Sequence, residues 1–177
     1  MSEIILDNIG ALADQCHQVA VDCGWWTDLA TGERIIRDRG TLLMLCVSEV
    51  SEAIEAWEMR AMDDKLTGRR GVEVELADLL IRVLDFIPGL GYHDEFVDAM
   101  GLLTRQNVPF FGGDGGPPGP ARFLGIIRYL AVAMEYDRKN QPSKRFPHLP
   151  GRVVHTAQSV RATLKLGTLR GANLHDA

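Results

Sequence analysis

Two short segments of the chain carry paired acidic residues at a spacing that suits a metal site. Glu49 and Glu52 are three positions apart, and Glu75 and Asp78 repeat that spacing after a gap of 22 residues. Residues three apart share one face of a helix. Four carboxylates that face one another repel unless a cation neutralises them, and their hard oxygen ligands suit Mg²⁺ or Mn²⁺. A single Glu-x-x-Glu pair is usually only a solvated helix face, but two matched pairs favour a divalent cation site.

The residues around each acid pair predict the helices that must position it. Apolar residues recur every three or four positions from about Asp38 or Thr41 to Met59, and again over 72–87, where Pro88 and Gly89 are expected to end the helix. Each acid pair borders the apolar stripe of its helix. If the two helices pack antiparallel, the four carboxylates face one another. The stripes are Leu43, Cys46, Val50, Ala53, Ile54 and Trp57 on the first helix, and Val72, Leu76, Leu79, Val83 and Phe86 on the second.

The rest of the chain predicts an all-α protein. Helical periodicity appears over 4–21, 93–103, 121–137 and 152–166, and there is no strand pattern, heptad run or internal repeat. Residues 112–120 contain five Gly and three Pro, which cannot continue a helix. We therefore expect a catalytic helical bundle over 1–103, a Gly/Pro-rich connector over 104–120, and a C-terminal helical extension over 121–177 that packs on the bundle or on a neighbouring subunit.

Composition and charge narrow the class of protein. The 177 residues are 46% hydrophobic and 24% charged, which excludes a disordered chain or a disulfide scaffold. The net charge of −5 argues against general nucleic-acid binding. Acidic residues are concentrated in residues 1–137, whereas 138–170 hold eight basic residues and no acid.

Three cysteines without a C-x-x-C pair suit a reduced compartment. No apolar run approaches the roughly 20 residues of a membrane span, and the first residues lack the basic start of a secretion signal. We expect a cytoplasmic protein with no membrane partner.

The acid pairs and their surroundings resemble a known family. Gly24-Trp25-Trp26, Ser48-Glu49-x-Ser51-Glu52-Ala53 and Glu75-Leu76-Ala77-Asp78-Leu79-Leu80 are similar, over about residues 5–100, to the E-x-x-E and E-x-x-D signature of the MazG-like, all-α nucleoside triphosphate pyrophosphohydrolases. Ser48 stands where many members have a further acid. The resemblance implies Mg²⁺-dependent cleavage of an NTP or dNTP between the α- and β-phosphates. It also implies that Glu49, Glu52, Glu75 and Asp78 are both the metal ligands and the catalytic residues.

Other residues are candidates for substrate binding. Trp25 or Trp26 could stack on a nucleobase, or one of them could seal the helix junction. Arg82 and Asp85 continue the row of charged residues that Glu75 and Asp78 begin on the second acidic helix. The segment with Lys139, Asn140 and Lys144 is similar to one that contacts phosphates in some family members. Lys65, Arg69 and Arg70 flank the hinge between the two acidic helices, within plausible reach of a triphosphate.

Several alternatives remain open. A general similarity to phage-type members points to purine substrates such as (d)GTP, but a dUTPase, a dCTPase or a phosphoribosyl-ATP pyrophosphohydrolase would use the same reaction. A non-catalytic helical interaction module is the rival from another class. The lack of any Glu-x-x-His pair argues against a ferritin-like di-iron bundle. Val74, Ile81 and Leu84 give the second acidic helix another apolar face, which calls for a homodimer, a homotetramer or cover by the C-terminal helices.

Overall fold

The computed structural model describes residues 8–110 and 119–169, and these residues form an all-α fold without a strand. This confirms that the chain is all-α, as the sequence predicts. The helices are α2 (Ile9–Asp22), α3 (Arg39–Met59), α4 (Gly71–Gly89), α5 (His93–Arg105), α6 (Pro120–Lys139) and α7 (Gly151–Leu169). None of the helices in this described part is long and apolar enough to cross a membrane.

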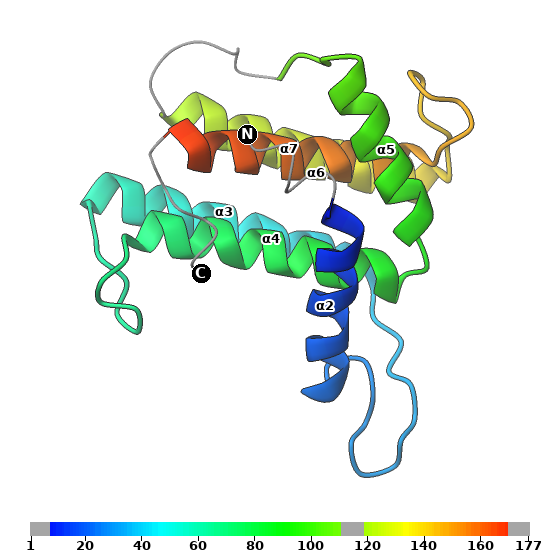
Figure 1. Cartoon of the computed structure of the whole chain (residues 1–177), viewed down its shortest axis with the longest axis horizontal. Helices are drawn as coiled ribbons and strands as arrows, with labels where there is room; N and C mark the ends of the chain where they lie inside the picture. Colours follow the sequence, from blue (N-terminus) through cyan, green and yellow to red (C-terminus); the bar gives the residue numbers. More distant parts are fainter. Residues whose placement is uncertain (1–7, 111–118, 170–177) are drawn as a thin grey trace.

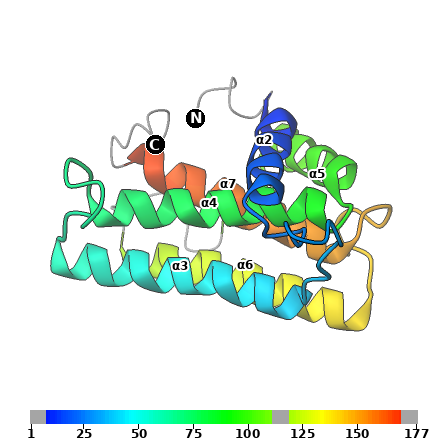
Figure 2. The ribbon, with the colours of Figure 1, turned by 90° about the horizontal axis from the view of Figure 1, so that it is seen from below.

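Four helices lie side by side along the long axis of the molecule. Figure 2 shows α3 beside α6 in one row and α4 beside α7 in the other. The two shorter helices lie across this arrangement, α2 against α4 and α5 against α7 (Figure 1). The predicted C-terminal extension thus packs against α3 and α4 of its own chain. Most of the predicted connector, residues 111–118, lies outside the described residues.

The apolar stripes predicted for the acidic helices form the centre of the core. Cys46, Val50 and Ala53 of α3 are fully buried, and so are Leu76, Leu79 and Val83 of α4. Because the stripes meet, the edges that carry the acid pairs also meet. The second apolar face of α4 is partly covered within the chain, since Leu84 is buried while Ile81 stays half-exposed. This face therefore needs no second subunit to cover Leu84.

The ends of α3 and α4 follow from local chemistry. Asp38 accepts a hydrogen bond from the Thr41 N–H at 2.7 Å and so caps the start of α3. The prediction that α4 ends before Pro88 is wrong, because the helix continues to Gly89 with Pro88 in its last turn. A proline there removes only one terminal hydrogen bond, and the N–H groups of Leu90 and Gly91 close the helix end by bonding the Phe86 and Pro88 carbonyls.

Two loops at opposite ends of the molecule have the same structure. Residues 60–70 join α3 to α4, and residues 140–150 join α6 to α7. Each loop begins with a residue at positive φ, Arg60 at 53° and Asn140 at 46°. Equivalent hydrogen bonds follow at a constant offset of 80 residues: Ala61 N to Ala56 O, Asp63 N to Arg69 O and Gly71 N to Ala61 O in the first loop; Gln141 N to Tyr136 O, Ser143 N to Leu149 O and Gly151 N to Gln141 O in the second.

The correspondence extends from the loops to three-helix units. α2, α3 and α4 form one unit and α5, α6 and α7 the other, with α2 packed on α4 as α5 is packed on α7. The expectation that the chain has no internal repeat is therefore wrong. The repeat escapes the sequence because few matched positions are identical, Gly71 and Gly151 among them.

Candidate metal and nucleotide site

Carboxylates from α3 and α4 converge at the edge of the core. Glu49, Glu52 and Glu75 each place one oxygen within 4.8 Å of the others. Glu49 is only 4% exposed, Glu75 is partly buried and Glu52 faces solvent. Asp78 follows Glu75 on the same face of α4, and its charge interacts with that of Glu49. The structure thus brings together three of the predicted ligands and places the fourth beside them.

The electrostatics of this cluster reflect crowded negative charge. Burial raises the pKa of Glu75 to about 7, and the neighbouring Glu52, Glu49 and Asp78 add to that rise. Burial and the charge of Glu49 also raise the pKa of Asp78, against the opposing effect of Arg82. A cluster of this kind favours either a proton or a cation.

Arg82 supplies one positive charge at the edge of the cluster. Its Nε donates to Oε1 of Glu49 at 2.5 Å. The Arg82 side chain is 39% exposed, so its guanidinium also reaches solvent. One arginine does not neutralise four carboxylates. The set of hard oxygen donors therefore fits a divalent cation such as Mg²⁺ or Mn²⁺.

A buried polar network lies one turn beyond Arg82. Asp85 is 7% exposed, and its Oδ1 accepts a hydrogen bond from Trp26 Nε1 at 2.6 Å. His17 Nδ1 lies 2.9 Å from the same oxygen. Trp26 therefore has the role of a residue that seals the helix junction, one of the two readings left open above. Gly89 is part of this arrangement, because a Cβ there would lie 2.4 Å from Cζ2 of Trp26.

A pocket of about 230 Å³ opens between α2, α3 and α4. Its lining is largely apolar, with Arg82 and Asp85 as its charged members. Trp25 lines it too, and Arg37 holds this tryptophan by donating to its carbonyl oxygen and by placing its guanidinium 4.0 Å from the centre of the indole ring. The other lining residues are Cys16, Val19, Ala20, Leu42, Leu45, Ile81 and Phe86.

The pocket and the carboxylates occupy consecutive turns of the same two helices. Along α3, Leu45 lines the pocket and Glu49 follows one turn later. Along α4, which runs back beside α3, Asp78 precedes the pocket residues Ile81 and Arg82 by one turn. A ligand in the pocket can therefore extend along the helices to the carboxylates, passing Arg82.

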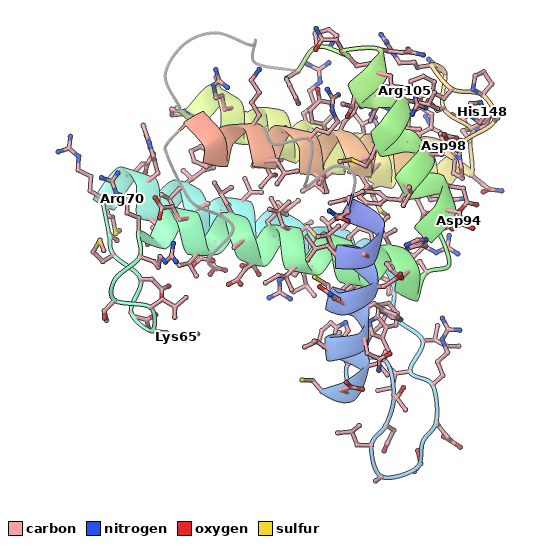
Figure 3. All side chains as sticks on the ribbon, in the orientation of Figure 1. Lys65, Arg70, Asp94, Asp98, Arg105 and His148 are labelled. Carbon is pink, nitrogen blue, oxygen red and sulfur yellow. The ribbon has the colours of Figure 1, made fainter. Side chains whose placement is uncertain are left out.

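The predicted phosphate-binding segment lies elsewhere. Lys139 is paired with Glu135 at 2.6 Å, and Asn140 accepts from Arg152 at 2.9 Å. Together with Lys144 these residues belong to the 140–150 end, whereas the loop with Lys65 adjoins the cluster. Figure 3 shows His148 and Lys65, from the two loops, far apart. The structure does not bring Lys139, Asn140 or Lys144 to the carboxylates. Lys65 is closer, because its charge partly opposes the rise in the pKa of Asp78.

In the described part of the second three-helix unit, the positions equivalent to the acid cluster are not acidic. The positions that match Glu49, Glu52, Glu75 and Asp78 hold Tyr129, Val132, His155 and Gln158. Arg161 and Lys165 match Ile81 and Asp85, and their charged groups lie 4.9 and 5.4 Å from the centre of the Phe110 ring. Within the described residues, the acid cluster therefore belongs to one unit alone.

Sequence reasoning missed the pocket and the role of Asp85. Cys16, Val19 and Leu42 are indistinguishable from core residues in a sequence, so nothing predicts that they line a cavity. The signal for Asp85 is its place in the acidic row of α4, on a helix otherwise apolar around it.

Comparison of the chain with protein-family models, with curated proteins and with solved structures finds no match.

Proposed function

We propose that the chain is a MazG-like pyrophosphohydrolase that hydrolyses a nucleoside triphosphate between its α- and β-phosphates, with Mg²⁺ as cofactor. One observation carries the proposal. Three carboxylates from two helices converge within 4.8 Å, and a pocket lined by Trp25 lies one turn away along the same helices. A nucleotide would use both features. Its base has flat, apolar faces that suit the pocket, and its phosphates bind cations of the kind that the carboxylates would hold.

The chain's residues divide the work along α3 and α4. The pocket holds the base, with Trp25 available for stacking, which contributes about 1–3 kcal/mol per base. Arg82 lies between pocket and carboxylates, where it can donate hydrogen bonds to the phosphate nearest the nucleoside. Glu49, Glu52, Glu75 and Asp78 would hold the cation, which would neutralise the triphosphate and make a bound water a better nucleophile. Water and triphosphate then give a monophosphate and pyrophosphate.

The carboxylates also position one another. Glu49 is fixed by Arg82 and is almost fully buried, so its orientation is set before any ligand arrives. Glu52 and Glu75 face it from the neighbouring turn of α3 and from α4. Such preorganisation reduces the reorganisation that binding and catalysis would otherwise require.

Pyrophosphate release from each common NTP and dNTP, with Mg²⁺ and with Mn²⁺, tests the proposal. Glu75→Gln and Asp78→Asn should each lower turnover at least about 100-fold while the protein stays folded. Glu55→Gln is the matched control, because Glu55 is an exposed glutamate of α3 outside the cluster and should keep full activity. Retained activity in Glu75→Gln would place the reaction elsewhere.

The same panel separates the alternatives. Turnover confined to dUTP or dCTP would identify an enzyme of that specificity, and turnover of phosphoribosyl-ATP alone would identify the third relative. A folded protein that releases pyrophosphate from none of these compounds and shows no cation-dependent stabilisation would be a helical interaction module. The homodimer or homotetramer expected for such an enzyme stays a prediction, which sedimentation measures.

A further inference from the structure

Asp85 is the one carboxylate that lines the pocket. Its two hydrogen bonds, from Trp26 Nε1 and with His17 Nδ1, both involve Oδ1. Within the described part of the chain, no hydrogen bond reaches Oδ2. Because Asp85 lines the pocket, Oδ2 is the acceptor that it offers to a ligand.

The pocket suits one ring system and not a whole nucleotide. Its volume of about 230 Å³ is below the ≈ 300–1,000 Å³ of pockets that enclose drug-sized ligands. Ribose and phosphates must therefore lie outside it, along α3 and α4 towards the carboxylates. The polar group that meets the bound base is then the Asp85 carboxylate, since Arg82, three residues earlier on α4, faces the phosphates.

The chemistry of this carboxylate discriminates between bases. An ionised carboxylate only accepts hydrogen bonds. Adenine, cytosine and guanine each have an exocyclic amino group on the pairing edge, next to a ring-nitrogen acceptor in adenine and cytosine and next to a ring N–H in guanine. Uracil and thymine have two carbonyl oxygens there with one N–H between them, so a carboxylate that accepts from this N–H lies against carbonyl acceptors that it repels and cannot satisfy. A buried acceptor left without a donor costs about 1–3 kcal/mol.

We infer that Asp85 selects nucleotides whose base carries an exocyclic amino group and rejects those of uracil and thymine. This inference rests on the proposed function for the identity of the ligand as a nucleotide, and it narrows that function to a substrate class. It also disfavours the dUTPase alternative. Asp85 is a specificity-determining residue, and Trp26 and His17 are positioning residues that hold its carboxylate by one oxygen.

Pairs of substrates that differ only at the amino position test this inference without any mutation. The pairs are dCTP with dUTP, dATP with dITP, and dGTP with dITP. In the pair that contains the best substrate, the amino-bearing member should have a kcat/KM roughly 10- to 100-fold higher. If the member of that pair without the amino group is hydrolysed equally well or better, the inference is overturned.

Variants assign the selectivity to Asp85. Asp85→Asn replaces one acceptor by an amide N–H donor and should reduce the ratio within that pair to less than about threefold. Trp26→Phe should lower the melting temperature and also reduce the ratio, because the indole N–H no longer holds the Asp85 carboxylate in place. Asp94→Asn, the same change at a fully exposed aspartate, should alter neither. A ratio unchanged in folded Asp85→Asn would contradict the assignment. If that variant does not fold, the wild-type pairs and Trp26→Phe still decide.

Binding of the monophosphates separates this inference from the proposed reaction. Calorimetry with dCMP against dUMP, and with dAMP or dGMP against dIMP, needs neither turnover nor cation. An amino preference in binding without pyrophosphate release from any triphosphate would overturn the reaction and keep the role of Asp85. Pyrophosphate release with no amino preference in either assay would overturn the role of Asp85 and keep the reaction.

Discussion

Glu75 combines two properties that a metal ligand needs, a defined place beside other carboxylates and an unfavourable charge. Its pKa of about 7 means that the cation-free protein takes up a proton there at pH values where an unfolded chain would not. The folded state therefore loses stability as pH rises from about 4.5 to 7. A bound cation would remove this penalty by neutralising the carboxylates.

Replacing Glu75 by Gln tests that electrostatic cost. Without divalent cation, the Glu75→Gln variant should be more stable than the wild type at pH 8, by about 1 kcal/mol after allowance for solvent screening. Below pH 4.5 the difference should largely vanish, because the wild-type carboxyl is then protonated in both states. Denaturant unfolding at both pH values in EDTA measures it. A variant less stable than the wild type at pH 8 would show that Glu75 is not a destabilising charge.

Gly89 shows how the hydrogen bond between Trp26 and Asp85 depends on close packing. A Cβ at this position would lie 2.4 Å from the Trp26 ring, so Gly89→Ala should displace Trp26 and cost about 1–3 kcal/mol. Gly68→Ala is the control, since no atom lies within 4 Å of the added carbon. Thermal unfolding of both variants measures the difference. Equal stability of the two would mean that Trp26 is not held against Gly89.

The sequence predicts the positions of some residues of this site but not of others. The spacing of Glu49, Glu52, Glu75 and Asp78 predicts their common face, because helical geometry relates residues three apart. It does not predict the hydrogen bond between Arg82 and Glu49, or the place of Asp85, because both depend on how α2 and α3 pack on α4. Lys139 and Lys144 are predicted from the similarity of a short segment to contact phosphates. The structure does not bring them to the carboxylates.

Hydrophobic periodicity predicts well where the helices lie in the sequence, but it does not predict that the two three-helix units are equivalent. α3 and α4 follow their expected stripes closely, since large apolar residues recur at helical spacing. α7 is less obvious, because Thr156, Ser159 and Thr163 are buried in its core face, each donating its hydroxyl hydrogen to a carbonyl of the preceding turn. The repeat of three-helix units is recognised from equivalent backbone hydrogen bonds in the two loops. These hydrogen bonds cannot be read from the sequence.

A double-mutant cycle tests whether the two helical hairpins, α3 with α4 and α6 with α7, are built alike. A Cβ on Gly151 would lie 2.0 Å from the Tyr136 ring, whereas a Cβ on the matching Gly71 would lie 3.0 Å from the small side chain of Ala56. Gly151→Ala should therefore destabilise the protein by several kcal/mol, more than Gly71→Ala does. Tyr136→Ala should recover part of the loss, because it recreates the first hairpin's pair. Strictly additive unfolding free energies would contradict this equivalence.

In the whole molecule, one three-helix unit should respond to a divalent cation and the other should support it. Saturating Mg²⁺ or Mn²⁺ should raise the stability by about 3 kcal/mol at 100 times Kd. For a chain of this length that is a rise of roughly 6–12 °C in melting temperature. Glu75→Gln should lose most of the shift and Glu55→Gln should keep it. His155→Gln, in the unit without the acid cluster, should also keep the cation-induced rise in melting temperature. If this variant loses the rise, the cation binds elsewhere.

The most direct test of the proposed pyrophosphohydrolase reaction is the product balance from a hydrolysed nucleoside triphosphate. With Mg²⁺ present, purified protein should form nucleoside monophosphate and pyrophosphate in equal amounts, and EDTA should stop the reaction. Nucleoside diphosphate and inorganic phosphate as products would contradict cleavage between the α- and β-phosphates. Absence of turnover across the full panel of NTPs and dNTPs would contradict the proposed enzyme altogether.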